Sequence, residues 1–133
     1  MKIVGRDILE KVHSEAKASP RLRMNYNIHE SLDEEVHKLL NSLQPGTVMP
    51  IHRHLHPEKK ETFVLLEGSL EVLKYDDNKK IIERHLMSHK SGNILCEIMP
   101  DEWHSFVVLE PDTLILEIKK GPYVPFQEID ILK

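Results

Sequence analysis

Cysteine, glycine and aromatic residues are scarce in this chain of 133 residues, which has one cysteine, five glycines and 5% aromatic residues. The single cysteine excludes an intramolecular disulfide framework, and the low glycine content excludes a collagen-like chain. No apolar run approaches the roughly 18 residues of a membrane span. Charged residues at positions 2, 6 and 7 interrupt the apolar stretch that a signal peptide needs. We therefore expect a cytoplasmic protein without a membrane partner.

An excess of charge of one sign is also missing. The 18 basic and 22 acidic residues give a formal net charge of −4, and the two signs are interspersed along the chain. Because no basic patch for phosphate backbones stands out, nucleic acid is not an expected partner. The 40% hydrophobic and 30% charged residues are those of an ordinary globular protein. A chain of this length suffices for one domain.

Residues 1–44 predict an N-terminal helical extension that packs on the rest of the domain. Between Asp7 and Ala18, apolar residues recur at helical spacing. Residues 21–28 alternate between polar and apolar side chains, as an extended and half-buried segment does. Residues 31–44 predict a second helix, because Ser31–Glu34 has the pattern of a capping box and an apolar stripe follows it.

Residues 45–133 have a different character and predict a β-barrel or sandwich. Short apolar runs rich in branched residues are separated by turn signals at close spacing, which is typical of mainly β proteins. The short connections favour antiparallel pairing. The candidate strands are 48–54, 62–66, 69–75, 80–87, 94–99, 104–109 and 113–119.

Histidine is abundant, with nine residues, and three of them form a pattern with one glutamate. His52 and His54 are two residues apart on a predicted strand, so both imidazoles project to the same face. Glu61 and His104 each stand at the start of a later apolar strand. These side chains can converge in a barrel, and such a set suits a transition metal with open coordination positions. The alternative is an exposed His-x-His pair that binds nothing.

The order of these residues resembles the cupin superfamily. The first cupin motif runs glycine, five residues, His-x-His, three or four residues, glutamate, six residues and glycine, and the second centres on a proline followed by histidine. The matching residues here are Gly46, His52, His54, Glu61, Gly68, Pro100 and His104. The resemblance implies a double-stranded β-helix, or jelly-roll barrel, in which three histidines and one glutamate bind a divalent metal.

Within this superfamily, nearly the whole chain resembles the small bacterial WbuC-type cupin-fold metalloproteins. The resembling stretches are 23–29, 44–47 with 52–54, 61–68, 103–105 and 117–123. The resemblance implies the N-terminal helical extension, one divalent ion (iron, nickel, manganese or zinc) and a link to polysaccharide or O-antigen biosynthesis. It implies no particular reaction. By analogy with cupins, a homodimer is expected.

One spacing differs from the cupin motif and leaves a second ligand set open. Six residues separate His54 from Glu61, whereas His56 restores a gap of four residues. We favour His52 and His54, because they keep the distance of five residues from Gly46. Moreover, a proline directly after His56 disfavours regular strand pairing there.

Other polar residues suggest a ligand site next to the metal. Arg23, Asn25 and Asn27, preceded by Arg21, are suited to an anionic or hydroxyl-rich ligand, although such a cluster can also be the solvated face of an edge strand. The remaining assignments are structural. Phe63, Leu65, Phe106 and Val108 are expected to line the barrel, Cys96 to be a small buried apolar residue, and His13, His37, His85 and His89 to lie at the surface.

Three functions fit this sequence. The first is a metal-dependent enzyme acting on a small sugar-derived or hydroxy/keto substrate by isomerase or epimerase chemistry, with His29 or Glu102 as candidates for the acid/base group. His29 could equally have a surface or capping role. The second function is a metal- and ligand-binding module without turnover, and an iron-dependent oxygenase is a chemical variant of the first. The third is an interaction protein that keeps the fold but binds no metal.

Overall fold

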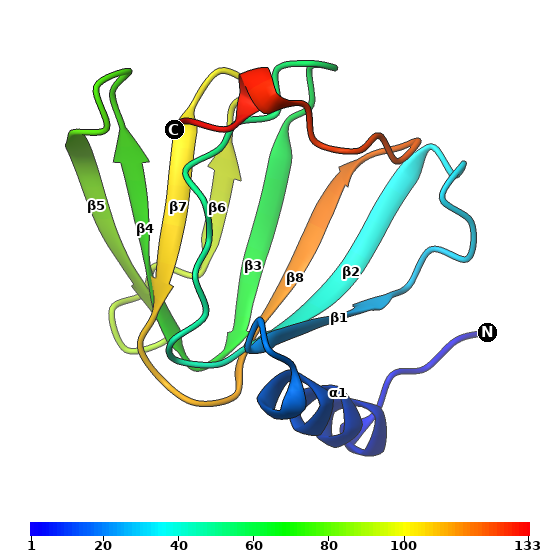
Figure 1. Ribbon diagram of the computed structural model, residues 1–133. Coiled ribbons are helices and arrows are strands. Elements are labelled where there is room, and N and C mark those ends of the chain that lie inside the picture. The colour runs from blue at the N-terminus through cyan, green and yellow to red at the C-terminus, as the bar shows by residue number, and fades with distance from the viewer.

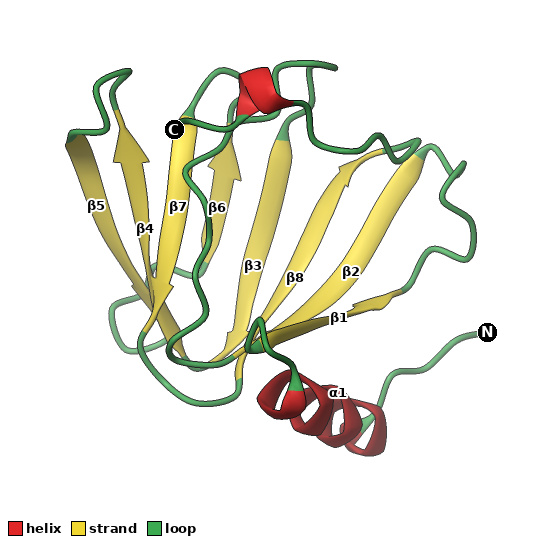
Figure 2. Ribbon diagram, in the orientation of Figure 1, coloured by secondary structure: helices red, strands yellow, loops and turns green.

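Two antiparallel β-sheets face each other in the computed structural model, which describes residues 1–133 (Figures 1 and 2). The larger sheet has the strand order β1-β2-β8-β3-β6, and the smaller one has the order β5-β4-β7. The strands are β1 (Arg23–Asn27), β2 (Val36–Leu43), β3 (Glu61–Glu67), β4 (Ser69–Tyr75), β5 (Ile81–Ser88), β6 (Leu95–Ile98), β7 (Trp103–Val108) and β8 (Thr113–Lys120). The predicted mainly β architecture is confirmed, as are six of the seven strands expected after residue 45.

Helix α1 (Arg6–Ala18) confirms the first predicted helix and lies against the outer face of β1 and β2. Its buried residues Val12, His13 and Ala16 follow helical spacing and form the face that contacts the sheet. A short 3-10 helix, η1 (Glu128–Asp130), is the only other helix. No helix of the structure has the length and apolar character needed to cross a membrane.

The second predicted helix is wrong, because residues 36–43 form strand β2 in the middle of the larger sheet. Apolar residues at 36, 39, 40 and 43 imitate a helical stripe. In the structure they belong to a strand that is buried on both faces, with α1 on one side and the interior on the other. Of the N-terminal region, therefore, only α1 is helical.

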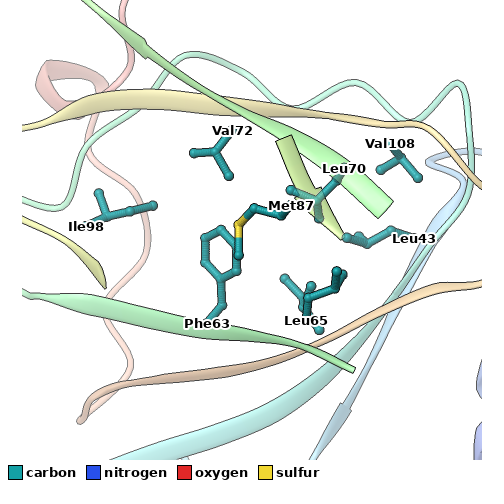
Figure 3. Close-up of a cluster of buried hydrophobic side chains, with 9 residues drawn as sticks. Leu43, Phe63, Leu65, Leu70, Val72, Met87, Ile98 and Val108 are labelled. Atoms are coloured by element: carbon teal, nitrogen blue, oxygen red, sulfur yellow. The ribbon is translucent and has the colours of Figure 1, made fainter. Parts of the chain in front are cut away.

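The hydrophobic core lies where the small sheet covers the larger one (Figure 3). Phe63 and Leu65 of β3 are each 1% exposed and pack with Leu70 of β4 and Val108 of β7. Phe106 and Cys96 are partly buried against this cluster. The expected barrel-lining residues are thus confirmed, and Cys96 is the small apolar residue predicted.

The segment 48–54 is not the regular strand that alternation predicted. Only His52 makes bridges there, to His104 of β7 on one side and to Ile131 of the C-terminal segment on the other. Figure 1 shows this stretch running alongside β7, and the C-terminal segment crosses the end of the sandwich at which β3 and β7 begin. Backbone hydrogen bonds in both directions between His52 and His104, of 3.1 and 2.9 Å, hold this residue beside β7.

Two histidines assigned to the surface are buried. His13 lies on the face of α1 that contacts the sheet and is 6% exposed, with Nδ1 2.6 Å from the Ser42 hydroxyl. His37 is 2% exposed and stacks on His29 with 4.0 Å between ring centroids. The surface assignment depended on the lack of a second ligand at suitable spacing, which says nothing about burial. In β2, successive side chains alternate between two covered faces.

Candidate metal centre and its cavity

Four side chains converge at the end of the sandwich where β3 and β7 begin. One potential ligand atom from each of His52, His54, Glu61 and His104 lies within 4.8 Å of the others. Glu61 is the first residue of β3, His104 the second of β7, and the two other histidines come from the segment beside β7. These four predicted residues come together although they are up to 52 positions apart in the sequence.

The tautomers of His52 and His104 are determined by backbone carbonyl groups. Nδ1 of His52 donates a hydrogen bond of 2.8 Å to the Pro50 carbonyl, and Nδ1 of His104 donates one of 2.9 Å to the Glu102 carbonyl. Since a carbonyl can only accept, each Nδ1 carries the proton and each Nε2 has a free lone pair. Nε2 of His104 is buried without any hydrogen-bond partner. This is the arrangement that a metal-binding imidazole needs.

His54 and Glu61 are also arranged as two ligands of one ion would be. Nε2 of His54 lies 2.6 Å from Oε2 of Glu61, yet this buried nitrogen forms no hydrogen bond. Glu61 itself is 6% exposed. A buried carboxylate and unpartnered imidazole nitrogens are costly without a compensating partner, and a divalent cation would supply one. The residues present therefore fit a metal.

The protonation states favour cation binding as well. Burial, with His104 as a neighbour, lowers the pKa of His52 to about 4. Burial also lowers the pKa of His104. Burial alone would raise the pKa of Glu61, but the contact with His54 and the proximity of His104 lower it below its usual range. Near neutral pH, His52 and His104 are neutral and the carboxylate is ionised, so the site offers lone pairs and one negative charge.

A cavity of about 210 Å³ opens beside the cluster on the inner face of the larger sheet. His52, His54 and Glu61 line it, together with Arg21, Arg23, Met24, Asn25, Leu39, Asn41, Leu43, Met49, Phe106, Glu117, Lys119 and Phe126. The predicted ligand-binding residues Arg23 and Asn25 thus line the cavity that the metal cluster faces. Asn27 does not line it, but its side-chain oxygen accepts a hydrogen bond from Asn25 at 3.1 Å.

Glu117 and Lys119 of β8 are cavity residues that the sequence analysis did not identify. The strand register places Glu117 between Leu39 of β2 and Phe63 of β3, on the inner face of the sheet. Nζ of Lys119 lies 3.5 Å from a Glu117 carboxylate oxygen. Burial and the negative charge of Glu61 raise the pKa of Glu117 to about 8. A glutamate at an inward position of an apolar strand was the signal that could have revealed it.

Three other candidates lie outside this cavity. The side chain of His56 turns away to Asp130, with 2.9 Å between Nδ1 and Oδ1, so the structure brings His52 rather than His56 into the cluster. His29 is buried, but it packs against another imidazole. Glu102 lies behind His104, lines a separate cavity of about 140 Å³ and pairs with Lys74 at 2.7 Å.

The aromatic ring of Phe126, from the C-terminal segment, covers part of the cluster. Its centroid lies 5.1 Å from that of His52 and 5.2 Å from that of His54. Asp130 holds this segment in place, because it accepts hydrogen bonds from Arg53 Nε at 3.1 Å and from the His56 backbone at 2.8 Å. The C-terminal segment therefore forms one wall of the site.

Comparison with solved structures shows the fold. KdgF from Halomonas sp. superposes with a TM-score of 0.60 at 17% identity, over 80% of this chain and 84% of that one. A sugar phosphate isomerase of the cupin superfamily from Silicibacter pomeroyi superposes with a TM-score of 0.57 at 18% identity, over 74% of this chain and 59% of that one. Oxalate decarboxylase from Bacillus subtilis, which has Mn(II) centres, superposes with a TM-score of 0.57 at 18% identity, over 84% of this chain and 27% of that one.

These likenesses confirm the cupin fold with one N-terminal helix. The chain spans 59% of the sugar phosphate isomerase and 27% of the oxalate decarboxylase. No curated protein matches the chain. A family model described as "Domain of unknown function (DUF6016)" matches residues 4–87, which include three residues of the cluster but not His104.

Proposed function

The chain belongs to the family described as a domain of unknown function, DUF6016, and we propose that it is a metal-dependent enzyme for a small sugar-derived or hydroxy/keto substrate. Isomerase or epimerase chemistry is the reaction class. The observation that carries the proposal is the convergence of three imidazoles and one carboxylate with buried, unpartnered nitrogens at an open cavity.

His52, His54, Glu61 and His104 would hold the ion. A divalent metal (iron, nickel, manganese or zinc) supplies Lewis acidity that polarises a carbonyl or lowers the pKa of bound water. A divalent ion bound by three neutral imidazoles and one carboxylate would give the site a net charge of +1, which favours an oxygen-rich or anionic ligand. The hydrogen bonds to Nδ1 of His52 and His104 orient both rings before a ligand binds.

The chain's other residues would bind and orient the substrate. Asn25 and Asn41 offer amide groups to hydroxyls, and Phe126 shields the histidines from bulk water. His29 and Glu102 remain the acid/base candidates from the sequence. Of these two, Glu102 contacts a residue of the cluster, because its backbone carbonyl accepts a hydrogen bond from Nδ1 of His104.

The finer assignments belong to this proposal too. The resembling sequence stretches support a WbuC-type cupin and a role in polysaccharide or O-antigen biosynthesis. Analogy with proteins of the cupin superfamily supports a homodimer. The second candidate function is a module that binds metal and a small ligand without turnover. It is favoured by the small number of ionisable groups in the cavity apart from the ligands; these groups are Arg21, Arg23, Glu117 and Lys119.

Metal content tests the site. We expect about one metal ion per chain in untagged wild-type protein, its loss in His54→Ala and His104→Ala, and its retention in His56→Ala, which removes the alternative ligand. Wild-type protein that stays metal-free after incubation with each of the four divalent ions would overturn the proposal. Metal-loaded protein in D₂O then separates the two functions, since an isomerase or epimerase that transfers a proton through an acid/base group incorporates deuterium into sugar substrates and a binding module does not.

A further inference from the structure

Two arginines that line the cavity have no acidic partner. The chain contains five arginines. Three of them pair with carboxylates: Arg6 with Glu67 at 2.9 Å, Arg53 with Asp130 at 3.1 Å and Arg84 with Glu71 at 2.7 Å. Arg21 and Arg23 form no ion pair, although both line the cavity of the metal cluster. The unpaired guanidinium groups are therefore concentrated at this one site.

Arg23 is held in place but not saturated. Its Nη1 donates hydrogen bonds to the Val48 carbonyl at 2.8 Å and to the Thr47 hydroxyl at 3.4 Å. The same hydroxyl donates to the Arg21 carbonyl at 2.7 Å, so Thr47 contacts both the Arg21 backbone and the Arg23 guanidinium. Nε and Nη2 of Arg23 have no protein partner. A fixed guanidinium with free donors is preorganised for a two-point contact with an anion.

The positive charges of Arg21 and Arg23 also favour a bound anion. Two like charges lie close to each other, and burial together with Arg21 lowers the pKa of Arg23. The third cavity cation, Lys119, is directly paired in the sheet with the ionised Glu61. An anion bound between the two arginines would remove their mutual repulsion and complete their hydrogen bonds.

The strand register places these arginines far from the metal end of the cavity. Arg23 is paired with Leu43, which is paired with Thr113 at the start of β8. Glu61 is paired with Lys119, six residues further along β8. The side chains at both ends line one cavity, with Asn25 and Asn41 also lining it. A ligand that uses both ends must be elongated.

We propose that Arg21 and Arg23 form an anion subsite, so that the ligand of this cavity is an elongated polyhydroxylated acid. Its carboxylate or phosphate group binds the two arginines, and its hydroxyl or carbonyl oxygens, at the other end, face the metal cluster. This deepens the proposed function by naming the substrate class. The anion subsite itself does not depend on the metal, so it is tested without one.

The first test uses metal-free protein in EDTA and records NMR spectra of backbone and side-chain amides during titration with acetate and with inorganic phosphate. We expect saturable shifts at residues 21–25 and at the Asn41 amide. These shifts should be absent in Arg23→Gln and in Arg21→Gln, the second of which changes an exposed side chain and leaves the Arg23 contacts intact. Arg84→Gln is the matched control and should behave as wild type. Non-saturable shifts, or saturable shifts that persist in both cavity variants, would overturn the subsite.

The second test uses metal-loaded protein and calorimetric titration with D-glucuronate, D-glucose 6-phosphate and D-glucose. Charge-assisted hydrogen bonds imply that at least one of the two acids binds about tenfold or more tightly than the neutral sugar, and the preferred acid identifies the group as carboxylate or phosphate. Arg23→Gln should remove this preference. Equal affinity for all three sugars would overturn the substrate class. A protein that fails to load metal but passes the first test would refute the proposed function and leave the anion subsite standing.

Discussion

Replacing Glu117 by glutamine should remove a pH dependence of stability from the metal-free protein. In the folded chain, burial and Glu61 raise the pKa of Glu117 from 4.5 to about 8. The unfolded chain therefore loses this proton near its ordinary pKa, whereas the folded chain keeps it until the pH approaches 8. In this interval the folded state binds more protons, so the free energy of unfolding falls as the pH rises.

The size of this effect follows from the displacement of the pKa. One pKa unit corresponds to about 1.4 kcal/mol, so the free energy of unfolding should fall by roughly 4 kcal/mol between about pH 5 and about pH 8.5. Glutamine has a similar shape but does not titrate. Glu117→Gln should therefore lack this fall, and its stability relative to wild type should improve as the pH rises.

Urea denaturation followed by Trp103 fluorescence at the two pH values measures this difference. EDTA keeps the protein metal-free, so that Glu61 keeps its influence on Glu117. Glu97→Gln is the control, because its side chain is 44% exposed and contacts only Lys60 and the Thr62 hydroxyl at the surface. If Glu117→Gln and wild type show the same change in stability between the two pH values, the carboxyl group is ionised in the folded state and the reasoning is refuted.

Three further predictions concern the fold and the metal. Gly68→Ala should destabilise the chain by about 2 kcal/mol or more, because φ is +80° and the added Cβ would lie 2.7 Å from the backbone of β8. Gly92→Ala, also at positive φ but in open space, should cost only about 1 kcal/mol; equal melting temperatures of the two variants would contradict this. Phe63→Ala should lower the free energy of unfolding, measured by chemical denaturation, by about 3 to 5 kcal/mol, because Phe63 is 1% exposed. Leu95 is 60% exposed, so Leu95→Ala should lower it by less than about 1 kcal/mol; similar losses in the two variants would show that the core lies elsewhere. Removal of metal should lower the melting temperature, since an ion at 1,000 times its Kd stabilises by about 4 kcal/mol, and His54→Ala should be insensitive to EDTA; an equal response of both proteins would locate the metal at another site.

The sequence by itself determined the class of fold and identified four residues that the structure brings together. Alternation and turn signals correctly predicted six of the seven strands expected after residue 45, because a strand with one covered face shows its period directly. The spacing of His52, His54 and Glu61 from Gly46 and Gly68 pointed to the ligand set, and His104 followed a proline turn. These are local patterns, and local patterns can be read along a chain.

Only the tertiary structure decided the remaining features. Residues 36–43 form a strand, because α1 covers one face and the interior lies on the other, and no local period distinguishes such a strand from a helix. His52 rather than His56 enters the cluster because Asp130, more than 70 residues later, binds His56. The placement of Glu117 and Lys119 in the cavity depends on the register of β8 between β2 and β3. Each of these outcomes depends on contacts between residues that are distant in the sequence, which the chain's local pattern does not encode.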